Sequence, residues 1–188
     1  MKRILLFAAM ALISAAAFAQ PKFAHVNFTE LYQLMPEADQ ARATLNAATA
    51  EAQETYQTMI DEYQNKANQY QQKSATWTAA IKDAKEKELV DIQNRIQELQ
   101  QTISQELQQK QAELMNPIME KAQKAVQDLA KAQGIVAVFD SGSALYFDES
   151  AVVDLTPAAR KALGIKEGRT LEQLQQELQA QAQAQNVQ

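Results

Sequence analysis

The chain has 188 residues, a formal net charge of −5, one histidine and no cysteine. The acidic balance argues against a general nucleic-acid binder, which would be basic. The lack of cysteine excludes disulfides and a lipid-modified cysteine, and one histidine cannot form a typical zinc site, so we expect no metal and no cofactor.

Residues 1–19 have the three parts of a secretory signal peptide. Lys2 and Arg3 form a basic start, Ile4–Ile13 is an uncharged apolar stretch, and Ala17–Ala19 matches an A-x-A cleavage site. The apolar stretch is too short to cross a bilayer comfortably. We therefore expect cleavage near Ala19 and an exported, soluble mature chain.

A long helical tract follows, because no glycine or proline occurs between Pro36 and Pro117. Ala, Gln, Glu and Lys dominate it and favour helix, whereas an ordinary helix has only about three turns. Its second half carries apolar residues at steps of three and four, which is a coiled-coil seam. These residues are Leu89, Ile92, Ile96, Leu99 and Ile103.

The tract predicts either one rod or two helices that fold back on each other. Ser74–Thr78 clusters poor helix formers near its middle. A turn there makes two arms of equal length, each with a proline at its base. We favour an antiparallel coiled-coil hairpin arm over residues 36–115.

Short strands are predicted on both sides of the tract. Phe23–Asn27 precedes it, and Ile135–Asp140 follows Gly134, which predicts a helix end. Ser141–Ser143 predicts a turn that brings Ala144–Phe147 back as a hairpin partner, and Val152–Val153 is a candidate for a further strand.

The remaining chain predicts two further elements. Thr156 is a candidate helix N-cap, and Pro157 suits the first position of a short helix that ends at Leu163. The tail, residues 166–188, is rich in Gln and Ala, and its three leucines lie on one helical face. It either docks on the rest of the chain or stays disordered.

So few strands cannot form a stable sheet alone, and their edges stay open. We expect a small β-rich oligomerisation body, residues 20–35 and 116–165, that is completed by copies of itself. The strand residues expected at its contacts are Val26, Val136, Val138 and Leu145. The predicted fold is α+β and mostly helical.

Basic residues gather near the predicted turn, around Trp77. We assign this tip as a candidate binding surface for acidic polypeptides or for the head groups of an anionic membrane. The alternative is a solvated coiled-coil end. The candidate binding residues are Lys66, Lys73, Trp77, Lys82, Lys85 and Lys87.

Tyr56, Tyr63 and Tyr70 recur every seven residues, so they share one stripe of the helix. They form either the seam within the arm or a surface that grips an unfolded chain.

Nothing in the sequence predicts an enzyme. Asp140–Ser143 lacks the G-x-S-x-G frame of a serine nucleophile and fits a turn. His25, which lies in a predicted strand, fits a packing or hydrogen-bonding residue better than a ligand.

The order of motifs resembles the OmpH/Skp family of periplasmic chaperones. The resemblance rests on Ala24–Asn27, Leu31 through Glu37, Asn116–Ile118 and the end from Gly134 to Thr156. It implies a homotrimer whose β-barrel-like body carries three helical arms around a cavity. It implies that the cavity holds unfolded outer-membrane proteins in the periplasm without ATP or cofactor. The alternative is a structural coiled-coil spacer or adaptor of the cell envelope.

Overall fold

The computed structural model describes residues 21–185, and the predicted signal peptide lies outside them. The chain forms two compact units. A body unit contains the described residues up to Met35 and from Lys121 onward, and a helical unit spans Pro36–Glu120. The predicted bounds of body and arm differ from these by a few residues near Pro117.

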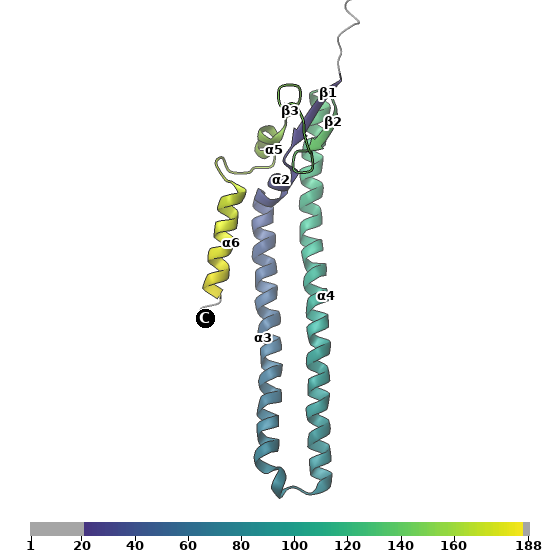
Figure 1. Cartoon of the computed structure of the whole chain (residues 1–188), viewed down its shortest axis with the longest axis vertical. Coiled ribbons are helices and arrows are strands. Elements are labelled where there is room, and N and C mark those ends of the chain that lie inside the picture. Colours follow the sequence, from purple (N-terminus) through teal and green to yellow (C-terminus); the bar gives the residue numbers. More distant parts are fainter. Residues whose placement is uncertain (1–20, 186–188) are drawn as a thin grey trace, which may run out of the picture. The chain divides into compact units, whose positions relative to one another are not determined.

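The helical unit consists of α3 (Pro36–Lys73), the short 3-10 helix η1 (Ser74–Thr76) and most of α4 (Ala79–Ala132). The break between the helices falls in the segment where the sequence clusters poor helix formers. An ion pair from Lys66 to Glu88 joins the helices across the break, so the chain reverses direction there. Figure 1 shows α3 and α4 side by side, joined by this turn.

Helix α4 passes through Pro117 without a break, so residues 116–132 are helical. Proline removes one hydrogen bond, which leaves the carbonyl of the residue four positions earlier without its usual donor. That residue, Glu113, is exposed, as is Pro117. Water can therefore satisfy the carbonyl, and the strong helix formers on either side continue the helix.

The body unit contains a three-stranded sheet in the order β2-β1-β3. Its strands are β1 (Lys22–Val26), β2 (Ile135–Asp140) and β3 (Val153–Asp154). Both β2 and β3 pair with β1 in parallel, and His25 lies opposite Phe139 on one side and Asp154 on the other. The N-terminal strand is therefore the centre of the sheet.

Two predictions about the sheet are wrong. Ala144–Phe147 is not a strand, because the chain leaves the sheet after Asp140, whose carboxylate accepts hydrogen bonds from the backbone of Phe28 and Gly142. It returns only at β3, as parallel pairing requires a long connection. The strand that contains Val26, for which we expected an open edge, is the central strand and has a neighbour on each side.

Helix α2 (Phe28–Leu34) and α5 (Thr156–Ala162) build the core of the body unit. Leu31, Leu34, Met35 and Leu155 are its largest fully buried side chains. Asn27 caps α2 by accepting a hydrogen bond from the backbone N–H of Glu30, at 3.0 Å.

Thr156 does not cap α5 as predicted. It is the first residue of the helix, and its hydroxyl accepts a hydrogen bond from the backbone N–H of Asn27 at 3.1 Å. The side chain therefore ties the start of α5 to the end of β1. The cap residue is Leu155, whose side chain makes no capping hydrogen bond.

The tail forms α6 (Leu171–Gln185), which packs against α2. Its Leu174 is only 4% exposed. Thr170 and Gln173 exchange hydrogen bonds between side chain and backbone, which is a capping box. Of the two alternatives for the tail, the structure has the docked helix.

One arginine secures the docked tail. The Arg160 guanidinium pairs with Glu30 of α2 and donates to the backbone carbonyls of Lys166 and Arg169. It thus joins α2, α5 and the connection to α6 in a single network.

Candidate functional site

The tip of the helical unit is closed by aromatic and polar contacts. Trp77 follows η1 and packs edge-on against Tyr70, with ring centroids 5.7 Å apart. The Tyr70 hydroxyl donates to Glu86 across the turn, which raises the pKa of that hydroxyl. Trp77 is half-buried, because its ring packs within the turn instead of lying free on the surface of the tip.

Two of the candidate lysines are engaged by one carboxylate. Lys66 and Lys85 both pair with Glu88, which lies on α4. The hydrogen bond from Lys66 is the largest of the effects that lower the pKa of Glu88 to about 2, and the bond from Lys85 comes next. The same pairing raises the pKa of Lys66. Lys66 lies on α3, so its ammonium group helps to hold the two helices together, whereas Lys85 lies on α4 and pairs with Glu88 within that helix.

The other three lysines keep their charge available. In the part of the chain that the structure describes, Lys73, Lys82 and Lys87 have no carboxylate within ion-pair distance. Ile81, beside Lys82, is an exposed aliphatic side chain. The tip thus offers three unpaired cations and one apolar group.

The tyrosine stripe lies partly in the seam. Tyr56, Tyr63 and Tyr70 are all half-buried, as expected for residues at the margin of two packed helices. Of the three, Tyr70 makes a side-chain hydrogen bond across the turn, to Glu86. This placement supports the interpretation as a seam, although part of each ring remains accessible.

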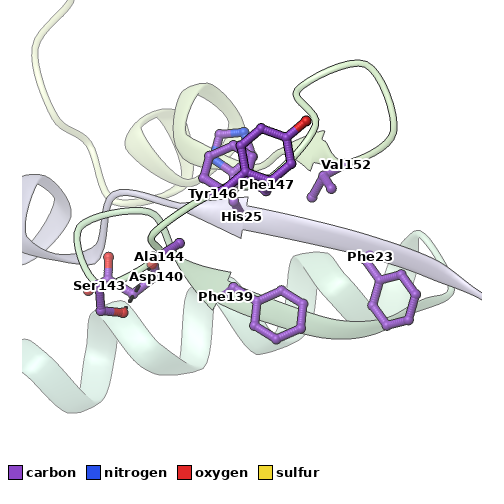
Figure 2. A pocket seen from close by; sticks show the side chains of 9 residues that line it. All are labelled: Phe23, His25, Phe139, Asp140, Ser143, Ala144, Tyr146, Phe147 and Val152. Atoms are coloured by element: carbon purple, nitrogen blue, oxygen red, sulfur yellow. Dashed lines mark hydrogen bonds between the residues drawn. The ribbon is translucent and has the colours of Figure 1, made fainter.

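The outer face of the sheet in the body unit is aromatic and largely uncovered. Phe23 and Phe139 lie with ring centroids 6.1 Å apart, and Phe139 is 53% exposed. Figure 2 shows both rings on one side of the sheet. With Tyr146 and Val152 they line a cavity of about 450 Å³.

His25 lies at the inner end of this cavity and stacks on Phe147, with ring centroids 4.4 Å apart (Figure 2). Its Nδ1 atom is buried without a hydrogen-bond partner and lies 3.8 Å from an Asp154 carboxylate oxygen. The histidine is thus a packing residue of the sheet, as the sequence suggested.

The four predicted contact residues of the body have different environments. Val26 is 3% exposed and belongs to the chain's own core, Val136 is 68% exposed on β2, and Val138 is half-buried. Leu145 is fully exposed, but it lies in a loop rather than in a strand. Only Val136 and Leu145 offer large free apolar surface.

The sequence predictions missed Phe23, Phe139 and Tyr146, which carry most of the exposed aromatic surface. A signal was available for two of them, because side chains alternate between the faces of a strand. Phe23 and Phe139 therefore share a face with His25, while Ala24 and Val26 face the core.

Two features are absent from the described residues, 21–185. No cluster of His, Cys, Asp or Glu there could hold a metal ion. No helix there has both the length and the hydropathy to cross a membrane.

Comparisons with known proteins identify the family. A family model described as outer membrane protein (OmpH-like) matches residues 22–163. The chaperone protein Skp of Pectobacterium atrosepticum is 26% identical over 149 residues, which are 78% of this chain and 90% of that protein. The chaperone protein Skp of Yersinia enterocolitica is 26% identical over 141 residues, 75% of this chain and 86% of that protein.

The crystal structure of an OmpH-like protein from Caulobacter crescentus CB15 shares the fold. The two structures compare with a TM-score of 0.68 at 15% sequence identity. The matched region is 78% of this chain and 86% of the Caulobacter chain. Since the family model matches well over half of the residues, across both units, the chain belongs to the OmpH-like family.

Proposed function

We propose that the protein is an ATP-independent holdase chaperone of the periplasm. It captures unfolded outer-membrane proteins and keeps them from aggregating. The observation that carries this proposal is the OmpH-like match over residues 22–163, which includes both units, together with relatives that are named chaperones.

The helix pair α3–α4 acts as a projecting coiled-coil hairpin arm, and clients contact its inner face and tip through many weak interactions. Lys73, Lys82 and Lys87 supply the unpaired charge for acidic segments of a client or for transient contact with an anionic membrane. Lys66, Lys85 and Trp77 contribute less, because their side chains are already engaged within the tip.

The body unit associates into a homotrimer, so that three arms enclose a cavity. Two features support this step. The outer edge of β2 has no neighbouring strand among the described residues, and open edges invite pairing. Next to it lies the exposed aromatic and aliphatic surface of Phe139 and Val136, which water alone covers in a single chain.

A double variant tests the association. Val136→Asp with Phe139→Asp places two charges on residues that are more than half exposed, so a single chain should still fold. Light scattering should give a trimer for the parent and a folded monomer for the variant. A variant that stays trimeric would place the contact elsewhere. Lys161→Asp, at an exposed position of α5, is a control for added charge.

The holdase activity is tested directly with a denatured β-barrel protein diluted from urea. The parent should suppress light scattering by aggregates at stoichiometric amounts without ATP. A coiled-coil spacer or adaptor, the second candidate, would leave aggregation unchanged. The polar surface of the helical unit favours the chaperone, since a rigid spacer would carry an unbroken apolar seam along its whole length.

A further inference from the structure

An open groove runs along the seam between α3 and α4, within the helical unit. Its volume is about 350 Å³, and an apolar cavity of about 150 Å³ already holds a benzene-sized molecule. Its apolar floor is made of Ala48 and Ala52 from α3 and of Leu99, Ile103 and Leu107 from α4.

The groove exists because the two helices contribute side chains of unequal size. Nearer the tip, Tyr56, Met59 and Tyr63 continue the α3 seam, and the facing part of α4 contains Ile92 and Ile96, which are buried. Around the groove the α3 seam carries alanines, which leave space above the α4 side chains. Leu99, Ile103 and Leu107 are therefore only half-buried, although they continue the apolar periodicity of α4.

Charged side chains line the rim of the groove. Glu51, Glu106 and Lys110 are exposed and lie around the apolar floor. Among residues 21–185, none of these three side chains has an ion-pair partner. The rim thus carries an excess of one negative charge, which favours a ligand with a positive group beside its apolar part.

We propose that this groove binds aliphatic side chains of an unfolded polypeptide where they stand next to a basic residue. The inference deepens the proposed chaperone function and rests on it, since it names a binding site on the arm. It assigns the middle of the helix pair a charge preference opposite to that of the lysine-rich tip. An arm with both sites can hold segments of either charge.

The first test fills the groove. Ala52→Leu adds an aliphatic side chain to the floor, whereas Ala50→Leu makes the same substitution at an exposed position of α3. The probe is a fluorescein-labelled serine-rich peptide that carries leucines flanked by lysines, measured by anisotropy with the mature chain. Ala52→Leu should weaken binding about tenfold, equivalent to about 1.4 kcal/mol, while Ala50→Leu should bind as the parent does. Equal binding by parent and Ala52→Leu would overturn the proposal.

The second test changes the charged rim of the groove and leaves its floor intact. It therefore tests the proposal even if the Ala52→Leu variant does not fold. Glu51→Gln with Glu106→Gln should remove the preference for the lysine peptide over the same peptide with glutamates. Lys110→Gln should strengthen that preference. If neither rim variant changes it, the groove does not recognise this ligand.

The aggregation assay separates this inference from the proposed function. A parent that protects the β-barrel client, together with an Ala52→Leu variant that binds the lysine peptide equally well, refutes the groove and leaves the chaperone proposal standing. A parent that binds the peptide in an Ala52-dependent way but protects no client refutes the chaperone proposal alone.

Discussion

The body unit and the helical unit are stabilised in different ways. In the body unit, Leu31, Leu34, Met35 and Leu155 are completely buried, and backbone and side-chain hydrogen bonds join elements from both ends of the chain. In the helical unit no side chain larger than alanine is completely buried among the described residues, and most seam residues are half-buried. The body therefore depends on close packing, whereas the helix pair depends on helix propensity and distributed contacts.

The largest expected loss of stability follows from a substitution in the core of the body unit. Leu31→Ala should lower the free energy of unfolding of the body by about 2–5 kcal/mol, because it leaves a cavity among fully buried side chains. The matched change in the helical unit, Leu99→Ala, should cost clearly less, because Leu99 is only half-buried. Urea titrations followed by circular dichroism measure both, and equal losses would refute the difference between the units.

A smaller effect is expected at the network that secures the tail. Arg160→Ala removes the partner of Glu30 and the donor to two backbone carbonyls, at a cost of about 1–2 kcal/mol. Limited proteolysis should then cut the connection between α5 and α6 faster than in the parent. Arg160→Lys should restore only part of the protection, since lysine cannot reproduce the planar set of donors. An unchanged cleavage rate in Arg160→Ala would show that buried Leu174 alone holds α6.

The capping box at the start of α6 should contribute less to the stability of the docked helix than the Arg160 network does. Thr170→Ala removes one half of the reciprocal pair with Gln173 and should destabilise the docked α6 by about 1 kcal/mol. Amide hydrogen exchange in α6 should become faster, while exchange in α2 and the sheet stays as it is. Thr170→Ser keeps the hydroxyl and should behave like the parent. Faster exchange throughout the body unit would mean that α6 supports the whole core.

The smallest expected effect is on the stability of the tip of the helical unit, and it depends on pH. The pKa of Glu88 is lowered to about 2 in the folded chain, so its contribution to stability is present above the ordinary pKa of 4.5 and is lost as the pH falls towards 2. Glu88→Gln should therefore lower the unfolding temperature of the helical unit slightly at pH 7 and leave it unchanged near pH 2. Because both side chains of the Lys66–Glu88 pair remain partly accessible to solvent, added salt should also reduce the difference at pH 7. A difference that persists at low pH would refute the ion pair as its cause.

The local elements of this fold follow from local sequence signals. Ser74–Thr78 contains the break between α3 and α4. The predicted strand Phe23–Asn27 overlaps β1 (Lys22–Val26), and Ile135–Asp140 coincides with β2. Gly134 ends α4 with φ +66°, a conformation that glycine adopts without strain. Each of these depends on propensities that a few neighbouring residues determine.

The sequence predictions were wrong where contacts between residues far apart in the sequence determine the structure. Ala144–Phe147 has the composition of a strand, yet the Asp140 carboxylate accepts hydrogen bonds from the backbone N–H groups of Phe28 and Gly142, and the chain turns away from β2. Lys66 is basic in the sequence, but only the fold shows that Glu88, which lies on the other helix, engages it. The docked α6 is an intermediate case, because the capping box at Thr170 and Gln173 is visible in the sequence, whereas the role of Arg160 is not.

The central position of β1 has a consequence for how the protein folds. Both of its partners come from the other end of the chain, since Lys22 lies opposite Ile135 and Ala24 opposite Val153. Contacts between residues so far apart in the sequence form slowly, because a long loop must close first, whereas helices need only neighbouring residues. When the chain is synthesised from its N-terminus, the helix pair can form early, while β1 stays unpaired until β2 has emerged. During that interval the new chain carries an unpaired strand, which must avoid aggregation before the sheet can close.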